Sequence, residues 1–568
     1  MVRTGENGAM PDADAQATES ALREIRLTGM PGPDRARGLA EALVRVAGER
    51  PAPGSDRPDA EDAAAFPSAP PDSRQRAVRM AHALRRIALT CDPFSLAEAG
   101  PTTVAEGSTP SFAAWLEMLR NIPDRPPADL PVPDPATADA DELLGYLRTQ
   151  PAASHRLPFL LQLWQRGEAD TFLTGCGTFR GHPAARAYAP LLAWGAWRCG
   201  EADGAREWLA TGPDNFLSHN LRAAMALAAG DADAAREHWA RSLAFEPLQP
   251  HIVRQLATPA APEIRVADAD LAETSICLYS WNKVEPLMDT LRSLAASDIG
   301  PARVVLLNNG STVYTSDELE RAVASAAPGL RVRFDHLPVN IGAPAARNWL
   351  LTRPDVLASR FVAFLDDDVI LPPHWLRCYH QTLAAHPGAV AAGPKTVGPA
   401  RPRPVQYVYR FMDRLENGRF FLTPNAPALT DLGQFDAPLP ALTVMGCCHL
   451  FHMERWNALG VPDFDIRFSP SQVDDIEHDL QIWKAGGEVV YDGRVEVLHL
   501  QDTGAKIRGD LRAFAMGLAN HRKMEAKFEP TELAAMQRNA LIAEQRDWNG
   551  ALSTVGPVLP AEALAFYA

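Results

Sequence analysis

The pattern of apolar and polar positions divides the chain into two kinds of structure. From about residue 141 to 256, apolar positions recur at helical spacing. After Pro259, short apolar runs alternate with helical stretches. Such alternation is typical of an α/β domain with a mainly parallel sheet. The pattern therefore predicts an all-α region followed by an α/β domain.

The elements expected in the α/β part are short, and polar residues follow many of them. Expected strands are Thr274–Tyr279, Arg303–Leu307, Leu330–Leu337, Phe361–Leu365, Ala389–Ala392, Val489–Tyr491 and Val495–Leu498, and expected helices are Pro286–Leu294, Ala343–Leu351 and Trp375–Ala385. In parallel sheets, ligands bind beyond the carboxyl ends of the strands, so this is where candidate chemistry is sought.

The helical region contains an internal repeat. The octapeptide that begins at Gly200 (GEADGARE) recurs in similar form at Gly230 (GDADAARE), an offset of 30 residues, and each copy is followed by a tryptophan, Trp208 or Trp239. A Gly turn between small-residue helices resembles the tetratricopeptide (TPR) repeat, although the usual repeat length is about 34 residues. A generic Ala-rich helical bundle is the alternative interpretation.

Composition suggests that the rest of the chain is organised as follows. Residues 1–75 are expected to be largely disordered or linker, with one amphipathic segment at Ala21–Val46 and a Pro-rich stretch at Glu49–Ser73. Residues 76–140 are expected to be a helical segment and a second Pro-rich linker. TPR-like repeats over 141–262, an α/β domain over 270–505 and a C-terminal helical extension over 506–568 complete the predicted organisation.

Charge and cysteine content exclude several functions. The formal net charge is −15 and no long basic run occurs, which disfavours nucleic-acid binding. The seven cysteines form no CxxC pair, so neither a zinc site nor a disulfide framework is expected. The sequence shows no secretory signal and no apolar run of membrane-spanning length. A cytoplasmic location is expected, with a peripheral position at the inner face of the membrane as a second option.

The clearest chemical signal is an acidic triplet at the end of a predicted strand. Phe361-Val-Ala-Phe-Leu runs directly into Asp366, Asp367 and Asp368. Three adjacent carboxylates repel one another, and a hard divalent cation such as Mg²⁺, which prefers carboxylate oxygens and substrate phosphates, would relieve the repulsion. Asp366 and Asp368 lie on the same side of an extended chain. An acidic turn without a metal is the alternative.

Three further segments end in polar residues that suit nucleotide binding. The first strand leads through Ser280 to Asn282 without a Gly-rich loop, which argues against a P-loop or a dinucleotide-binding turn. It also argues against a sugar-1-phosphate nucleotidyltransferase. The strand Val304–Leu307 leads to Asn308 and Asn309, and a later loop holds Asn340, Gly342 and, within the following helix, Arg347.

In this order and spacing, the four segments resemble the family 2 glycosyltransferases of the GT-A fold, a Rossmann-like α/β architecture. The resemblance covers about 235 residues and implies that Ser280, Asn282, Asn308, Asn309, Asn340, Gly342, Arg347, Asp366, Asp367 and Gly446 bind a nucleotide sugar. It also implies a Mn²⁺ or Mg²⁺ ion held by Asp366 and Asp368. The family usually has Asp at the position of Asn308, which leaves the nucleotide base open, although a UDP-sugar is the expected donor.

The resemblance implies a catalytic base and a third metal ligand near the end of the domain. The acidic segment Asp474-Asp475-Ile-Glu477-His-Asp479-Leu480 is similar to the family's Glu-Asp-x-Asp-Leu segment. Matching Asp479-Leu480 to Asp-Leu gives Glu477 as the base, with Asp475 as the second candidate. Acids at a helix N-terminus that serve only the helix dipole are the alternative. His499, at the end of a late strand, is the candidate imidazole ligand.

These observations predict an inverting glycosyltransferase. The expected reaction moves a sugar from a nucleotide-diphosphate donor to a hydroxyl group of a glycan, a lipid-linked saccharide or a protein. The TPR-like repeats would bind the acceptor or a protein partner. The competing hypothesis is a TPR-based interaction protein whose glycosyltransferase-like domain binds nucleotide but is inactive.

Overall fold

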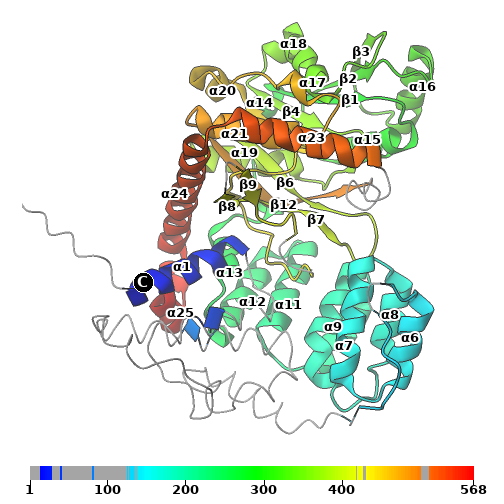
Figure 1. Ribbon diagram of the computed structural model, residues 1–568, viewed down its shortest axis with the longest axis vertical. Coiled ribbons are helices and arrows are strands. Elements are labelled where there is room, and N and C mark those ends of the chain that lie inside the picture. Colours follow the sequence, from blue (N-terminus) through cyan, green and yellow to red (C-terminus); the bar gives the residue numbers. More distant parts are fainter. Residues whose placement is uncertain are drawn as a thin grey trace, which may run out of the picture.

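A computed structural model describes residues 13–28, 39–40, 42, 80–81, 83, 125, 127–134, 137–416, 419–426, 430–500 and 511–567. It places an α/β domain beside an all-helical domain, with the long helix α24 (Pro530–Val555) running along both (Figure 1). The N-terminal helix α1 spans Ala13–Thr28. Most of the predicted disordered and linker segments between residues 1 and 124 lie outside the described residues.

The helical domain is a series of helices joined by short turns, as the periodicity predicts. Its helices are α6 (Ala140–Thr149), α7 (Ala153–Arg166), α8 (Ala169–Gly177), α9 (Ala185–Cys199), α10 (Ala202–Thr211), α11 (Phe216–Ala228), α12 (Ala232–Phe245) and α13 (Pro250–Ala257). Helices α9 and α10 pack as one pair and α11 and α12 as the next.

The two copies of the repeated octapeptide have the same structure. Gly200 and Gly230 both adopt positive φ angles, 91° and 81°, just after the first helix of a pair. Only glycine adopts this conformation without steric cost. Trp208 and Trp239 are both buried in the helical core. The repeat is therefore structural, while its assignment to the TPR class stays a prediction.

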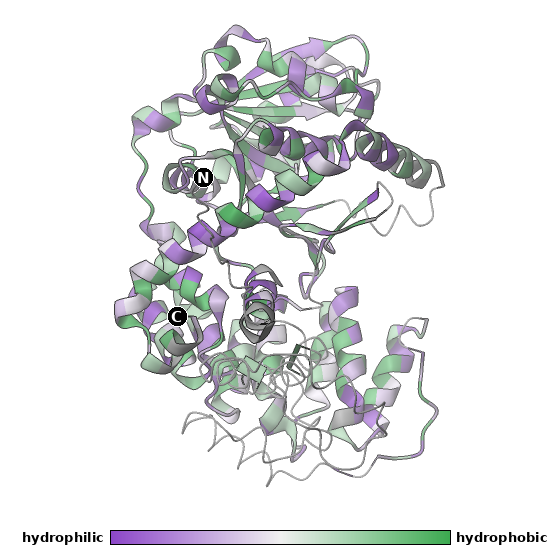
Figure 2. Ribbon diagram, turned by 60° about the vertical axis from the view of Figure 1, so that its left-hand side comes forward, coloured by the Kyte–Doolittle hydropathy of each residue, from purple (hydrophilic) through white to green (hydrophobic). Residues whose placement is uncertain are grey.

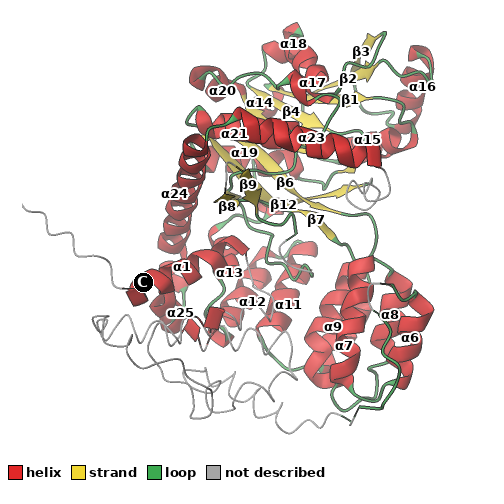
Figure 3. Ribbon diagram, viewed as in Figure 1, coloured by secondary structure: helices red, strands yellow, loops and turns green. Residues whose placement is uncertain are grey.

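The α/β domain is built on a mixed sheet with helices around it (Figure 3). The strand order is β10-β12-β6-β11-β4-β1-β2-β3, with β5 beside β12 and β7 beside β6. The strands are β1 (Thr274–Ser280), β2 (Arg303–Asn309), β3 (Val332–Leu337), β4 (Phe361–Leu365), β5 (Val369–Ile370), β6 (Ala389–Val397), β7 (Val405–Tyr407), β10 (Leu439–Pro440), β11 (Cys448–His452) and β12 (Glu488–His499), and a separate hairpin contains β8 (Met412–Glu416) and β9 (Arg419–Leu422).

Most of the paired residues belong to parallel strand pairs, whereas β5, β7, β10 and β11 run antiparallel to their neighbours. Strand β1 runs parallel to β2 and β4, β2 to β3, and β6 to β12. Strand β11 lies antiparallel between β4 and β6. The predicted α/β class with a mainly parallel sheet is confirmed.

Helices cover both faces of the sheet, which explains the uninterrupted apolar strands. Along β4, Phe361, Ala363 and Leu365 belong to one hydrophobic core, and Val362 and Phe364 belong to the other. Successive side chains of a strand point to opposite faces, so a strand buried on both faces must be apolar throughout. The helices of this domain carry both hydrophilic and hydrophobic residues (Figure 2), and their buried apolar residues belong to the two cores.

A different set of helices packs against each face of the sheet. On one face lie α15 (Glu285–Ala296), α16 (Ser316–Ala326) and α19 (Trp375–Ala385), and on the other lie α17 (Ala343–Leu351), α18 (Pro354–Leu357), α20 (Met453–Leu459), α21 (Asp474–Lys484), α23 (Leu511–Lys527) and part of α24. The short helix α14 (Asp268–Ala272) precedes β1.

The C-terminal helices join the two domains. Met536 and Ala540 of α24 lie in a core of the α/β domain, whereas Trp548 and Val555 lie in the core of the helical domain. The last helix, α25 (Ala561–Tyr567), packs against α12.

A buried ion-pair cluster reinforces this joint. Glu544 of α24 is fully buried and accepts hydrogen bonds from Arg254 of α13 at 2.6 Å and from Arg26 of α1 at 3.2 Å. A buried carboxylate needs such partners because desolvation penalises its charge. The C-terminal extension therefore packs as an integral part of the fold.

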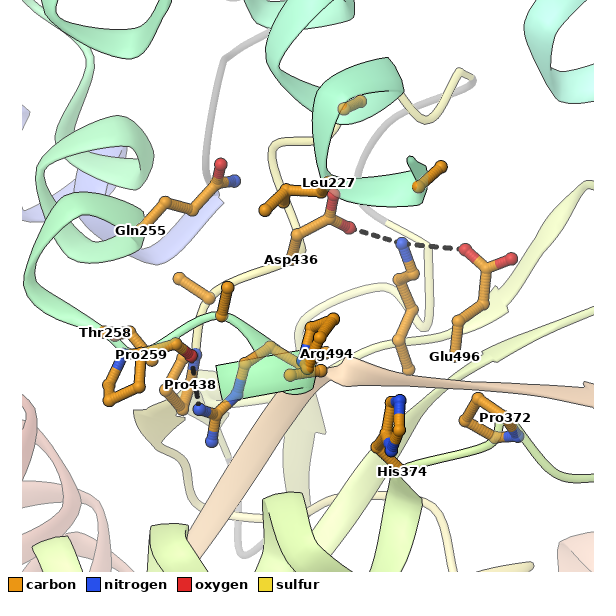
Figure 4. A pocket seen from close by; sticks show the side chains of 18 of the residues that line it. Leu227, Gln255, Thr258, Pro259, Pro372, His374, Asp436, Pro438, Arg494 and Glu496 are labelled. Atoms are coloured by element: carbon orange, nitrogen blue, oxygen red, sulfur yellow. Dashed lines mark hydrogen bonds and ion pairs between the residues drawn. The ribbon is translucent and has the colours of Figure 1, made fainter. Parts of the chain in front are cut away.

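A second buried ion-pair cluster joins the domains beside a cavity of about 450 Å³ (Figure 4). Lys395 of β6 lies 3.0 Å from Asp431 and 2.9 Å from Glu496. Arg198 of the helical domain lies 3.0 Å from each of these two carboxylates. Lys395 also pairs with Asp436, and Glu496 also pairs with Arg403. Arg198 is the cation that the helical domain adds to this cluster.

Replacing Arg198 by methionine should destabilise the protein by about 3–5 kcal/mol, because buried carboxylates lose a partner while an unbranched side chain still fills most of the space. The matched control is Arg206→Met, since the Arg206–Asp203 pair is exposed to solvent and should be worth less than about 1 kcal/mol. Thermal and denaturant unfolding of both variants measure the difference. Equal midpoints for the two variants would contradict an interdomain role for Arg198.

Candidate active site

The polar ends of the central strands meet at one edge of the sheet. Ser280, at the end of β1, lies in register with Asn308 at the end of β2. On the other side of β1, Leu278 is opposite Leu365, so the acidic triplet begins one residue beyond β4. The parallel register thus brings the predicted segments together, as expected at the carboxyl edge of such a sheet.

The structure groups the three predicted metal ligands. Strand β5 follows the triplet immediately and pairs with the end of β12, where His499 is opposite Val369. One ligand atom each of Asp366, Asp368 and His499 lies within 4.8 Å of the others. The pairing of these two strands therefore brings a histidine from late in the sequence to the acidic triplet.

This set of ligand atoms fits a divalent metal ion. Two carboxylates and one imidazole are oxygen and nitrogen donors of the kind that Mn²⁺ accepts. The Nδ1 atom of His499 is 3.1 Å from Oε1 of Gln406 on β7. A hydrogen bond from Nδ1 to this oxygen fixes the ring and leaves Nε2 available to a metal. The hydroxyl of Tyr279 donates to Asp366 at 2.8 Å and orients that carboxylate.

The charges around the triplet are strongly coupled. Burial raises the pKa of Asp368, but the hydrogen bond and charge of His499, together with Lys283, outweigh it and lower that pKa overall. Burial likewise opposes protonation of His499, yet Asp368 raises its pKa. The pKa of Asp367 is raised by burial, and Lys283 only partly compensates. The buried carboxylates of the triplet therefore favour positively charged partners at this edge of the sheet.

The predicted nucleotide-binding amides form the turns at the same edge. Asn308 and Asn309 are buried. The side-chain oxygen of Asn308 accepts from the amide of Ser311 at 3.0 Å. The side chain of Asn309 accepts from the amide of Ile341 at 3.1 Å and donates to Asn340 at 3.0 Å. Asn308 thus shapes its own turn, and Asn309 ties the end of β2 to the loop before α17.

Two predicted residues adopt backbone conformations that the loops require. Asn282 has a φ of 56°, and its side-chain oxygen accepts from the amide of Thr312 at 2.7 Å. Gly342 has a φ of 82°, and a Cβ there would lie 2.9 Å from the Ser469 hydroxyl oxygen. Asn282 therefore fastens the β1 loop to the β2 loop, and only glycine suits position 342.

Arg347 links the acidic triplet to helix α21. It is buried, forms an ion pair with Asp474 and lies 3.7 Å from Asp366. Its guanidinium also lies over the ring of Tyr279, 5.2 Å from the centroid. A cation between two acidic segments reduces their repulsion, so Arg347 holds the start of α21 beside the triplet.

The first turn of α21 places Asp475 at the predicted pocket. Asp475 is half-buried, and its Oδ2 accepts from the amide of Gly446 at 2.9 Å. A Cβ at position 446 would lie 2.6 Å from the Cβ of Asp475, so this approach requires glycine. The next residue, Cys447, accepts from the amide of Asp366 at 2.9 Å. Asp475 is thus one short loop away from the acidic triplet.

Glu477 has different surroundings. It is fully buried, lies 2.6 Å from the ammonium of Lys527 on α23 and accepts from Gln481 at 2.7 Å. Asn520, also on α23, donates to the carbonyls of Phe468, Ser471 and Gln472. Helix α23 thus holds both α21 and the loop before it.

The loop before α21 is held in a strained conformation. Gln472 and Val473 have φ angles of 78° and 69°. Positive φ is costly for a β-branched residue, and such strain tends to occur at functional sites. The bonds from Asn520 to this loop supply the restraint that keeps the conformation.

Sequence reasoning missed several residues of the site. Lys283 follows Asn282 directly, and its position beside a polar strand end could have been noticed. Gln406, Asn520 and Lys527 gave no signal, because they lie on elements that contact the site only in three dimensions.

Comparison with known proteins identifies the domain. Residues 275–454 match the sequence model of the family described as glycosyl transferase family 2. The chain carries a family 2 glycosyltransferase domain. The predicted resemblance to family 2 glycosyltransferases is thereby confirmed for this part of the chain. The matched range contains the acidic triplet and Gly446 but ends before α21 and His499, so the family match does not reach the candidate base.

Solved glycosyltransferases resemble the chain only distantly. GalNAc-T7 with UDP, GalNAc and Mn²⁺ is 16% identical over 40% of this chain and 43% of that chain, with a TM-score of 0.33. The mannosyltransferase PcManGT from Pyrobaculum calidifontis, in complex with GDP-Man and Mn²⁺, is 15% identical over 61% of this chain and 90% of that chain, with a TM-score of 0.34. TarS of S. aureus is 16% identical over 52% of this chain and 50% of that chain, with a TM-score of 0.28.

These likenesses are too weak to support an argument about the site. The chain spans less than half of the length of GalNAc-T7. A comparison with curated proteins gave no match. Among the described residues, no helix combines the length and the apolar character needed to cross a bilayer.

Proposed function

We propose that the protein is an inverting glycosyltransferase that moves a sugar from a nucleotide-diphosphate donor, with a UDP-sugar as the first candidate, to a hydroxyl acceptor. The observation that carries the proposal is the grouping of Asp366, Asp368 and His499 at the strand edge, with Asp475 one short loop away. A metal site beside a carboxylate is the arrangement that such a transfer needs.

The metal is assigned to Asp366, Asp368 and His499. When bound there, Mn²⁺ or Mg²⁺ would neutralise the charge of the departing diphosphate. The imidazole of His499 favours Mn²⁺ over Mg²⁺, because Mg²⁺ prefers an all-oxygen shell. Gln406 and Tyr279 keep two of the ligands in position.

Asp475 is the proposed base in place of the first choice from sequence, Glu477. A base must come within hydrogen-bond reach of the proton that it takes. Asp475 is half-buried beside Gly446, whereas Glu477 is fully buried against Lys527. Burial and ion pairing support a structural role for Glu477, which anchors α23 to α21.

The residues divide the reaction between them. The acceptor hydroxyl gives its proton to Asp475 as its oxygen attacks the anomeric carbon. The bond from that carbon to the diphosphate oxygen breaks, and its electron pair leaves with the nucleotide diphosphate. Attack from the side opposite the leaving group inverts the anomeric configuration. Ser280, Asn308, Asn309, Asn340 and Arg347 line or shape the proposed nucleotide pocket.

The helical domain is assigned to acceptor or partner recognition. Stacked helix pairs form extended surfaces, and none of the predicted metal, base or nucleotide residues lies on them. The candidate acceptors are a glycan, a lipid-linked saccharide and a protein.

A donor-hydrolysis screen tests the proposal without an acceptor. UDP- and GDP-sugars are incubated with the full-length protein and Mn²⁺, and the released nucleotide diphosphate is measured. Slow Mn²⁺-dependent release from at least one donor is expected. Nucleotide binding without any release from a broad donor panel would instead favour an inactive domain in an interaction protein.

Asp475→Asn should lower the rate of donor turnover by roughly 10²–10⁴-fold while leaving donor affinity nearly unchanged, because an amide cannot accept the proton. Glu477→Gln is the matched variant two residues away. It should retain most of the turnover rate and lower the unfolding midpoint, because Lys527 loses its buried partner. The reverse pattern in the two variants would return the base to Glu477.

Loss of a residue that only hydrogen-bonds to a metal ligand weakens metal binding by roughly 10–100-fold. Asp368→Asn removes a ligand itself, so it should weaken Mn²⁺ binding by more than this. Electron paramagnetic resonance of free Mn²⁺ measures the affinity directly, without turnover. Asp289→Asn, in an exposed ion pair on α15, is the control and should bind Mn²⁺ normally. Undiminished binding by Asp368→Asn would remove the assignment of the metal site.

A further inference from the structure

Lys283 lies beside the proposed metal ligands but has no role in the reaction described above. It follows β1 and precedes α15, and its side chain is 30% exposed. Its ammonium lies 2.9 Å from Asp367 and 2.8 Å from Asp368. A lysine is thus built into the acidic triplet.

One carboxylate serves both Lys283 and the metal group. The Oδ2 atom of Asp368 accepts from Lys283, and its Oδ1 atom lies 3.2 Å from Nε2 of His499. Since Asp368 and His499 are two of the three proposed ligands, a metal ion bound there shares Asp368 with the ammonium.

Sharing a carboxylate places two cations close together. At separations of a few ångströms, like charges repel by several kcal/mol where solvent is partly excluded. Lys283 therefore opposes metal binding while no anion accompanies the metal. A nucleotide diphosphate reverses the balance, because its phosphate oxygens attract the metal ion and the ammonium together.

We propose that Lys283 couples metal binding to donor binding: it weakens the site for the metal alone and contacts the diphosphate when metal and donor bind together. The inference rests on the proposed function, since it takes Asp366, Asp368 and His499 as the metal ligands. Lys283 acts here as a positioning residue for the diphosphate, and by linkage its effects on metal and donor are reciprocal.

The competing role for Lys283 is purely structural. In that role the ammonium only holds Asp367 and Asp368 in place. The two roles predict opposite effects on the metal. Loss of a competing cation strengthens Mn²⁺ binding, whereas loss of a structural tie loosens the ligands and weakens it.

The test is Lys283→Met, with Lys283→Arg as the charge-preserving control. Mn²⁺ affinity is measured by electron paramagnetic resonance without nucleotide, and UDP affinity (GDP if wild type prefers it) is measured by calorimetry at saturating Mn²⁺. For Lys283→Met, roughly tenfold tighter Mn²⁺ binding and roughly tenfold weaker nucleotide binding are expected, which lies within the usual range of coupling between sites. Lys283→Arg should stay close to wild type in both measurements.

Each other outcome is decisive. Unchanged or weaker Mn²⁺ binding by a folded Lys283→Met protein overturns the coupling role, and so does unchanged nucleotide affinity. Lys283→Gln repeats the measurement if the methionine variant does not fold. A wild-type protein that binds no Mn²⁺ overturns the metal site itself, which separates failure of the proposed function from failure of this inference.

Discussion

The electrostatic repulsion among Asp366, Asp367 and Asp368 is the constraint on which the site depends. Asp367 and Asp368 are buried at the end of a strand that is apolar on both faces. Burying adjacent carboxylates is unfavourable unless positive charge accompanies them. The structure supplies it from two directions, through Lys283 after β1 and Arg347 on α17, while the imidazole of His499 at the end of β12 lies 3.2 Å from Asp368. Each cation comes from a different element, so the triplet can be stable only when the edge of the sheet is fully assembled.

The sequence predicted much of the sheet because its strands are buried on both faces. A continuous apolar run bounded by polar residues has few alternatives, and Phe361–Leu365 was predicted with the bounds that the structure has. The predicted strands Val489–Tyr491 and Val495–Leu498 proved to be one strand, β12, with an irregularity between Asp492 and Glu496. Polar residues at that irregularity interrupted the apolar pattern, although the backbone continues to pair with β6.

The site was predictable only as far as local sequence specifies it. The acids that follow β4 could be read directly, whereas the contact of His499 with Gln406 depends on the neighbouring positions of β12, β6 and β7. The order of the acids on α21 shows a second limit. In an α-helix, two residues correspond to a rotation of about 200° about the axis, so side chains two positions apart lie on nearly opposite faces. Asp475 lies on the face of α21 toward Gly446, and Glu477 lies on the face toward α23. An alignment error of two residues therefore selects a carboxylate on the wrong face of the helix.

The contacts across the domain interface bear on whether the helical domain can be separated from the catalytic domain. Glu496 lies three residues before His499 on β12, and Arg403 lies three residues before Gln406. Arg403 pairs with Glu496 at 2.8 Å, and Arg198 of the helical domain pairs with the same carboxylate at 3.0 Å. The segments that position His499 and Gln406 are thus the ones that the helical domain holds through Glu496. None of the proposed metal ligands lies in the helical region, so the motif positions alone suggest that the metal site does not need it. The ion-pair cluster makes it part of the framework that keeps the histidine in place.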